Sequence, residues 1–463
     1  MNDINIFLAI IIFNVIFIFC SSNALAFSSE TKHSVEQKEQ IEQKEQKEQK
    51  DSDRSKYYII DQLLNNSVEK YSLSSANYLK GGNNSNIKYS LLFVEYNLDT
   101  QANLSDEDLF VFKGFAIYST LKDVEDNYLH PPSNKSGFLK YPDFKEGYLI
   151  HSEKKFDFLL GRAFITNGVA ELAGLAGNYN TVSFVASWMP TKIGVNQLRS
   201  DLYISDDKLS LYIIPKIDRS SVLPAGNRWE VATMINNNTN ISDQSSDKLI
   251  DKYGYLLTYN GIFKSIDYLF ELYHGDSSYW TFQYGSKADS YIKIDSKINE
   301  YIAGVAKNWD NFKLYHEMEY QQSVNQVNFD YFRTVSGYKI KEYSFSNKLS
   351  LDETELIMEY SYEKRYDKRS AQTYYSTSQL VELFSNSLKT NLKFTVNDRL
   401  YLSLFHCYAF KEGGMTYATT LSYTQSDTSS WKFIFTQFTG PNDSTYGNWK
   451  KNGSIFLNYT YIP

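Results

Sequence analysis

The feature that most constrains this chain is an alternation of apolar and polar side chains that recurs from residue 87 to the C-terminus. In residues 312–321 one face is apolar and the other is polar or charged: Phe312, Leu314, Met318 and Tyr320 against Lys313, Glu317, Glu319 and Gln321. Comparable segments occur at residues 90–98, 265–273, 355–363, 388–396 and 415–424. A period of two is that of a β-strand, whose successive side chains point to opposite faces. The sequence therefore predicts an all-β fold.

The length of these segments favours a membrane barrel over a soluble β-sandwich. They are about ten residues long, like transmembrane β-strands, whereas strands of soluble sheets usually have about five or six. After residue 26 no apolar run is long enough to cross a bilayer as a helix, so a membrane-embedded chain must close its sheet. We expect one transmembrane antiparallel up-and-down β-barrel.

The aromatic content supports a membrane location. The chain has 39 Tyr, 30 Phe and 6 Trp, together 16% of its residues. Tyr and Phe favour strands, and Tyr and Trp favour the boundary between lipid and water. The apolar faces are therefore expected to contact lipid and the charged faces a water-filled lumen.

Turn signals predict the number of strands. Short polar pairs separate some strands: Asp206-Asp207, Asn260-Gly261, Asp310-Asn311, Asp352-Glu353, Asn397-Asp398 and Asp427-Thr428. Longer polar stretches lie near residues 122–145, 219–250, 274–290, 322–337, 365–385 and 440–452. Alternating short periplasmic turns and long outer loops are typical of outer-membrane barrels, and roughly 22 residues per strand and connection predict 16 or 18 strands.

The N-terminal 86 residues divide into three parts. Residues 1–26 resemble a signal peptide: an apolar run at residues 6–20 is followed by Ala24-Leu25-Ala26, which predicts cleavage near Ala26. No Lys or Arg precedes the run, so an uncleaved anchor is the alternative. Residues 27–56 are a low-complexity Glu/Gln/Lys tail, expected to be disordered. Residues 57–86 are expected to be a linker or a short helix, and residues 87–463 the barrel.

The C-terminus resembles the last strand of outer-membrane barrels. Ile455, Leu457, Tyr459 and Tyr461 alternate with the residues between them. This pattern is similar to the signal that the barrel-assembly machinery recognises, although Pro463 stands where such proteins usually end in Phe or Trp. We therefore expect this machinery and the lipid bilayer to be partners of the chain.

A family resemblance covers residues 156–229. It rests on Phe156-Asp157-Phe158-Leu159-Leu160-Gly161-Arg162, on Ile165-Thr166-Asn167-Gly168, on Pro190, on the strand patterns at residues 194–203 and 208–215, and on residues 223–229. This block is similar to alginate-export-type barrels and to a related porin-like family of uncharacterised outer-membrane proteins, with Ala163 where the family has Gln. The resemblance implies that Arg162 lies in the lumen and faces Glu317 or Glu319.

The charged positions of the polar faces are the candidate lumen residues. These are Arg162, Arg199, Asp201, Glu271, Lys313, Glu317, Glu319, Glu359, Lys389 and Lys393. Rings of charged side chains select ions by sign, and the mixture of signs here predicts weak selectivity. The resemblance to alginate exporters implies an arginine-rich lumen, but the candidate residues show no such excess, so an acidic polysaccharide is not expected as a substrate.

Motifs for other chemistry were sought and not found. None of the six His residues has zinc-like spacing, no phosphate-binding or nucleophile motif occurs, and no cofactor, metal site or catalytic residue is expected. His316 on an apolar face raises the alternative of a lipid-facing hydrolase, but an interfacial histidine is the simpler interpretation. The net charge of -7 and the scattered Lys and Arg argue against nucleic-acid binding.

The sequence thus predicts an outer-membrane channel, not an enzyme, for passive passage of small polar or charged solutes. The alternative is a non-transporting surface barrel, an adhesin or structural protein that binds a partner through its long outer loops. A secreted soluble β-protein is a further alternative.

Overall fold

A computed structural model describes residues 62–463, except residues 79–89, 120–138, 178, 184–190, 216–239, 244–252, 279–280, 285–289, 295, 325–329, 367–373, 377–385 and 443. All described residues belong to one compact unit, Gln62–Pro463. The predicted signal peptide at residues 1–26 and the tail at residues 27–56 lie outside the described residues.

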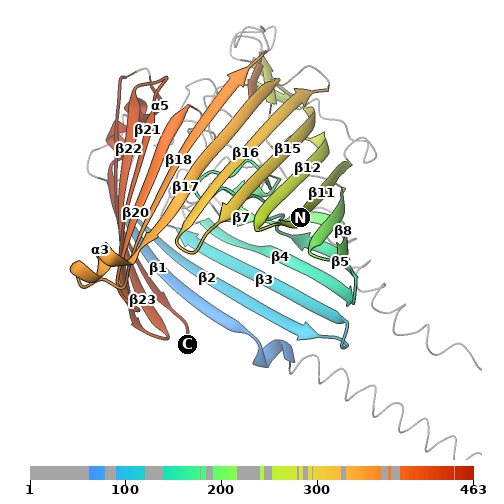
Figure 1. Cartoon of the computed structure of the whole chain (residues 1–463), viewed down its shortest axis with the longest axis horizontal. Helices are drawn as coiled ribbons and strands as arrows, with labels where there is room; N and C mark the ends of the chain where they lie inside the picture. Colours follow the sequence, from blue (N-terminus) through green and yellow to red (C-terminus); the bar gives the residue numbers. More distant parts are fainter. Residues whose placement is uncertain are drawn as a thin grey trace, which may run out of the picture. The chain divides into compact units, whose positions relative to one another are not determined.

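The described chain forms a closed antiparallel β-barrel of 18 strands (Figure 1). The first half of the wall comprises β1 (Val68–Tyr78), β2 (Ser90–Asn103), β3 (Asp108–Ser119), β4 (Leu139–Glu153), β5 (Phe156–Ala163), β8 (Val195–Ile204), β9 (Asp207–Ile214), β11 (Gly254–Phe263) and β12 (Ile266–Asp276). The second half comprises β15 (Lys297–Asn308), β16 (Phe312–Ser323), β17 (Tyr331–Glu342), β18 (Glu353–Arg365), β20 (Ser387–Asn397), β21 (Leu400–Ala409), β22 (Gly414–Ser426), β23 (Ser429–Thr439) and β24 (Ser454–Tyr461). Each strand pairs with the next, and β1 pairs with β24, which closes the ring. The structure confirms the predicted fold and the larger of the two predicted strand numbers.

The two faces of the wall have the predicted character. On β16 the outer side chains of Leu314 and Met318 are 50% and 41% exposed, whereas Glu317 and Glu319 point inward and are 0% and 3% exposed. The apolar stripes therefore lie on the outside of the barrel, where lipid would cover them, instead of meeting in a dry interior.

Aromatic side chains of the outer face gather near both ends of the barrel. Near the short turns the pairs are Tyr259–Tyr268, Trp309–Phe312 and Trp431–Tyr459, with ring centroids 5.7, 5.4 and 4.6 Å apart. Near the opposite end they are Tyr301–Tyr320 and Tyr360–Phe410, at 6.3 and 6.0 Å. Such girdles border the apolar band of transmembrane barrels, because Tyr and Trp favour the boundary between lipid and water.

Two predicted turns differ from the structure. Asn260-Gly261 lies inside β11, and the hairpin turn follows at Lys264-Ser265, whose φ values of 49° and 63° suit a tight two-residue turn. Gly261 is needed where it stands because an added Cβ would collide with Asp207 of the neighbouring strand. Asp352-Glu353 ends a longer connection, residues 343–352, that contains the helix α3 (Tyr343–Lys348).

The barrel begins earlier than the sequence pattern indicated. β1 starts at Val68, within the segment expected to be a linker or short helix, and a single helical turn at residues 62–65 precedes it. Leu64, Val68 and Tyr71 are spaced three or four residues apart, as on one face of a helix, but Leu64 lies in that turn and the other two lie in the strand. The inner face of β1 carries Ser72, Ser74 and Ala76, which are too small to make the alternation conspicuous.

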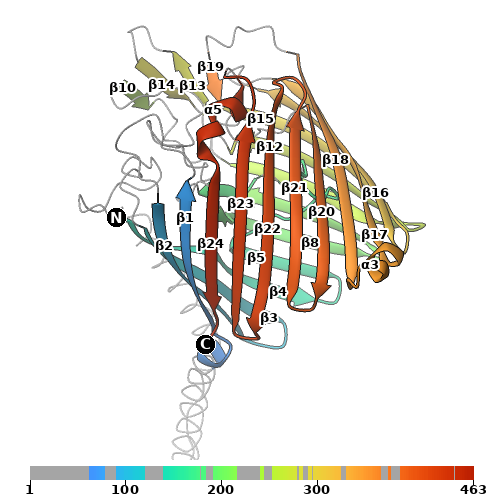
Figure 2. The same ribbon diagram turned by 90° about the vertical axis from the view of Figure 1, so that its left-hand side faces the viewer.

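Smaller elements occupy the long connections. The hairpin β6 (Thr181–Ser183) and β7 (Thr191–Ile193) follows β5, and α5 (Thr445–Asn448) and η2 (Lys450–Asn452) lie between β23 and β24. A second sheet joins β10 (Asn240–Asp243), β14 (Ser290–Ile294), β13 (Thr281–Tyr284) and β19 (Tyr374–Ser376), which come from three separate long connections (Figure 2). Among the described residues, no helix is long and apolar enough to cross a bilayer.

Candidate functional site inside the barrel

The connection between β5 and β8 reaches across the interior of the barrel with its described residues 164–177. Its Leu172 amide donates to Glu359 Oε2 of β18 at 3.0 Å. Going round the wall from β5, the strands are β8, β9, β11, β12, β15, β16, β17 and then β18. In a ring of 18 strands β18 is thus almost opposite β5. We call residues 164–180 of this connection the inner segment.

Glu317 on β16 holds the tip of the inner segment. Its Oε1 accepts hydrogen bonds from the backbone amides of Val169 at 2.5 Å and Ala170 at 2.9 Å, and its Oε2 accepts one from Leu175 at 2.6 Å. A carboxylate that accepts several backbone N–H groups forms strong charge-assisted bonds. Since the Glu317 side chain is fully buried, these amides take the place of water around its charge.

Two further carboxylates bind the same segment from neighbouring strands. Glu271 of β12 accepts from the Asn167 side-chain amide at 2.5 Å and from the Gly177 amide at 3.3 Å. Tyr179 donates to Glu271 at 3.3 Å and to Glu300 at 3.1 Å. Burial raises the pKa of Tyr179 well above its usual range, and the nearby Glu300 and Glu271 raise it further. The hydroxyl therefore stays protonated and available as a donor.

The base of the inner segment is fixed by its own polar contacts and by an apolar cluster. Asn180 accepts from the Ile165 amide at 2.9 Å and donates to the Ile165 carbonyl at 2.7 Å. Ile165 and Tyr179 pack with side chains of the wall: Val195, Tyr212, Ile214, Leu256, Tyr273 and Ile298. The segment is thus held at its base by apolar packing and at its tip by buried carboxylates.

Close approach of backbone to wall explains two glycines. Gly168 has a φ of 115°, and an added Cβ would lie 2.9 Å from Glu317 Oε1. On β15, a Cβ at Gly304 would lie 3.3 Å from both the Glu317 side chain and Val169 Cγ2. Both positions therefore favour glycine, the first for its backbone conformation and the second for space.

At its tip the segment presents one charged side chain to the lumen. Glu171 is bound by Lys313 Nζ at 2.7 Å and by Lys339 Nζ at 3.3 Å, and Lys339 also pairs with Glu355 at 3.2 Å. Burial alone would raise the pKa of Glu171, but the two lysines outweigh it, so the pKa lies below its usual value. All four side chains remain partly exposed, in contrast to the buried Glu317.

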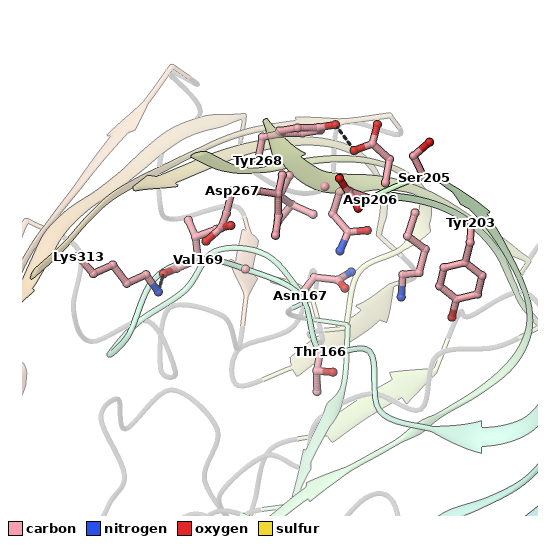
Figure 3. Close-up of a pocket in the computed structure, with 16 residues that line it drawn as sticks. Thr166, Asn167, Val169, Tyr203, Ser205, Asp206, Asp267, Tyr268 and Lys313 are labelled. Carbon is pink, nitrogen blue, oxygen red and sulfur yellow. Dashed lines mark hydrogen bonds between the residues drawn. The ribbon is translucent and has the colours of Figure 1, made fainter. Parts of the chain in front are cut away.

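A cavity of about 480 Å³ lies between the inner segment and the wall. Its lining includes Asn167 and Val169 of the segment and Lys208, Asp267 and Lys313 of the strands. Figure 3 shows Lys313 extended toward Val169, whose carbonyl oxygen it reaches at 2.8 Å. The cavity is lined by side chains of both charge signs and by amide groups. Among the described residues, no group of His, Cys, Asp or Glu is arranged to hold a metal ion.

A second connection fills another part of the interior. Tyr446 of α5 and Trp449 are buried and pack on Phe438, with centroids 6.3 and 5.7 Å from it. The cluster continues through Phe93, Phe115, Ile193, Cys407 and Phe456. Cys407 is fully buried there, and its Sγ lies 3.4 Å from the Tyr446 hydroxyl.

The predicted lumen residues lie on the inner face with one exception. Arg162 shares its face of β5 with Leu160, which is 51% exposed, so it points outward; its guanidinium lies 4.3 Å from the centre of the Phe144 ring. The placement in the lumen that the resemblance implied is therefore wrong. The strand continues its alternation through Gly161, and this puts position 162 on the lipid side.

The remaining predicted residues point inward, but most are buried. Arg199 pairs with the buried Asp201 at 3.1 Å, and Glu319 lies 3.7 Å from Arg333. Lys389 is buried between Ser361, at 3.0 Å, and Glu359, at 3.6 Å. Lys313 stays partly exposed beside Glu171, and Lys393 lies over the Tyr401 ring at 5.2 Å. Inward direction alone therefore does not make these side chains part of a water-filled passage.

His316 is paired on the outer face. Its Nδ1 lies 2.7 Å from Ser336 Oγ of the adjacent strand. A serine hydrolase also needs donors for an oxyanion, usually backbone amides. Ser336 belongs to β17, which is paired along both edges with β16 and β18, so the amides around Ser336 are committed to the sheet. The contact between His316 and Ser336 therefore satisfies the hydrogen-bonding groups of two polar side chains on an apolar surface.

The inner segment was not predicted from the sequence. Residues 165–168 were interpreted as part of a family motif, with no inward connection. A usable signal was the run of small residues at 166–177, TNGVAELAGLAG, between two strand patterns. Its glycines and alanines allow the backbone amides to approach the wall carboxylates.

Comparison with known proteins shows similarity in fold. No family model matches the chain, and no curated protein sequence matches it. The structure of OccAB2 from Acinetobacter baumannii aligns with a TM-score of 0.51 and 11% identity, covering 87% of this chain and 99% of that chain. OccK3 (OpdO) from Pseudomonas aeruginosa aligns with a TM-score of 0.47 and 8% identity, covering 88% of this chain and 98% of that chain. OmpT, an outer membrane protein of Vibrio cholerae, aligns with a TM-score of 0.39 and 9% identity, covering 86% of this chain and 99% of that chain. The chain has the fold of an outer-membrane β-barrel. The OccAB2 structure shares this fold over nearly the whole length of the OccAB2 chain.

Proposed function

We propose that this protein is an outer-membrane channel through which small polar or charged solutes pass passively, and that it is not an enzyme. The observation that carries the proposal is a closed barrel, apolar outside and polar inside, with an inner segment that narrows its interior. A narrowed polar lumen limits the size of a solute, and its charged side chains act on the sign of the solute.

The partly exposed charges of the interior support a mixed-charge passage. Lys145 pairs with Glu95 at 3.4 Å, and Lys341 pairs with Glu353 at 2.8 Å. Together with Lys313, Lys339 and Glu171 these side chains bring both signs to the lumen. We infer weak ion selectivity, and we do not propose an acidic polysaccharide as a substrate.

The proposed location follows from the outer surface. The apolar band and its aromatic girdles suit a lipid bilayer, which is the proposed environment. We further propose export with removal of residues 1–26 and insertion by the barrel-assembly machinery through β24. The last strand ends beside β1 and β23, as closure requires.

Reconstitution in planar bilayers tests the proposal. Refolded protein should produce discrete conductance steps, and protein lacking residues 27–89, which include β1, should produce none because its ring cannot close. The folded state of each preparation is checked by heat-modifiable migration in gel electrophoresis. If correctly folded full-length protein gives no conductance steps, an open channel is excluded.

The four-stranded second sheet favours one alternative, a surface barrel that binds a partner. Three long connections combine to form this sheet, and ordering them costs conformational entropy of the chain. A barrel that only conducts solutes does not require such an ordered outer sheet. Cells carrying the protein with residues 281–294 replaced by a flexible linker should keep conductance and lose adhesion if this alternative is correct.

A further inference from the structure

We infer that Glu317 is a positioning residue: it fixes the inner segment as a static constriction of the channel and takes no part in selecting ions. The inference rests on the proposed channel function and divides the inward carboxylates into two groups. Carboxylates of one group hold the inner segment and so set the width of the passage, and those of the other group are accessible to solutes and set its charge.

The geometry of Glu317 carries the first half of the inference. Both of its oxygens accept hydrogen bonds from amides of the inner segment, among them those of Val169, Ala170 and Leu175. Buried amides that lose their acceptor must find another partner or reach water. Without Glu317, the segment tip would therefore have to leave the wall to hydrate these groups.

Burial of Glu317 carries the second half. A charge selects ions when a solute can approach it, whereas the segment itself covers the Glu317 carboxylate completely. The neighbouring contacts of Glu359 with the Leu172 amide and of Glu271 with the Gly177 amide have the same character. The accessible charges of the lumen belong to other side chains, such as Glu171 and Lys339.

Glu319 offers a matched control on the same strand. It lies two residues further along β16, on the same inner face, and is also buried. Its described partners are the Tyr331 hydroxyl at 2.8 Å and Arg333 at 3.7 Å, both on β17. Removing its charge therefore leaves the contacts of the inner segment in place.

The first experiment compares Glu317→Gln, Glu319→Gln and the unchanged protein in planar bilayers. Single-channel conductance reports the width, and the reversal potential in a potassium chloride gradient reports ion selectivity. Glu317→Gln should raise the conductance and its noise without shifting the reversal potential, because the amide group presents a donor where the carboxylate accepted. Glu319→Gln should keep the conductance. A shift of the reversal potential by Glu317→Gln, or equal effects of the two variants, would overturn the inference.

A second variant keeps the test decisive if Glu317→Gln does not fold. Gly168→Ala disturbs the same contact from the segment side without changing any charge, and Gly174→Ala is its control, because a Cβ there lies at an ordinary 3.6 Å from Glu317 Oε2. Gly168→Ala should raise the conductance, and Gly174→Ala should not. Unchanged conductance in a folded Gly168→Ala protein contradicts the role of this contact.

A cross-link separates a static constriction from a moving gate. A Cβ at Gly304 would lie 3.3 Å from Val169 Cγ2, so the double variant Val169→Cys, Gly304→Cys places two thiols within bonding reach. Oxidation should leave the conductance of this variant unchanged, and loss of openings would show that the segment must move. If the unchanged protein does not conduct, the proposed channel function is wrong. If the unchanged protein conducts, the results with the variants test only the positioning role of Glu317.

Discussion

The glutamates of the interior differ in their surroundings, although they are one residue type and all but Glu171, which belongs to the inner segment, lie on strands of the wall. Glu317 and Glu359 are buried under backbone amides of the inner segment, whereas Glu171 and Glu355 are bound by lysines at the edge of the lumen. The alternation of the sequence predicted the inward direction of the strand residues correctly. It could not predict what covers them, because the covering residues are more than a hundred positions away in the chain.

The pKa of Glu171 predicts how the proposed channel responds to acid. Its lowered pKa means that its bonds to Lys313 and Lys339 contribute fully above the usual value of 4.5 and are lost as the pH falls through the lower folded value. From neutral pH to pH 4.5 the difference in current noise between a Glu171→Gln variant and the unchanged protein should therefore stay constant. Glu171→Gln should be noisier than the unchanged protein over this range, and the two should converge at lower pH. Convergence while the pH is still above 4.5 would contradict the pKa argument.

At the scale of elements, β1 decides whether the barrel closes. It pairs with β2 over residues 68–77 and with β24 over residues 71–78, so it supplies both edges of the seam. In lipid, an open sheet edge leaves backbone groups without partners, which is costly for each group. The boundary at Val68 is therefore a structural requirement that the weak alternation of β1 conceals.

Truncation tests this boundary. Removing residues 27–61 should leave the barrel able to fold, because all described strand pairs remain. Removing residues 27–89 should abolish the heat-modifiable band in gel electrophoresis, because β2 and β24 then face lipid unpaired. A folded band from the longer deletion would show that closure does not need β1.

At the scale of the whole molecule, the outer surface is organised by depth. Aromatic pairs lie toward both ends, and aliphatic side chains such as Leu314, Met318 and Leu404 lie between them. Lys307 and Lys364 lie 5.5 and 5.3 Å from the rings of Trp309 and Tyr366, where a long side chain can reach the aqueous boundary. This arrangement is what a bilayer as solvent favours.

A charge in the apolar band should be costly. Met318→Lys should lower the free energy of unfolding in phospholipid vesicles by roughly 2–4 kcal/mol, because the ammonium group is carried into hydrocarbon. Asp398→Lys, in an exposed turn, should change it by less than about 0.5 kcal/mol. Urea titrations followed by tryptophan fluorescence measure both, and equal values would indicate that lipid does not cover Met318.

The sequence by itself determined the closed barrel and the clearly alternating strands with their two faces, because a period of two is a local property that a bilayer and a lumen both reinforce. The weakly alternating β1 was not among these strands. It also determined most short turns and the direction of nine of the ten predicted lumen residues. Only the tertiary structure decided that residues 164–180 cross the interior and that Glu271, Glu317 and Glu359 hold them. These contacts join backbone amides to distant side chains, and an amide is common to nearly all residues, so no local pattern marks it as a partner.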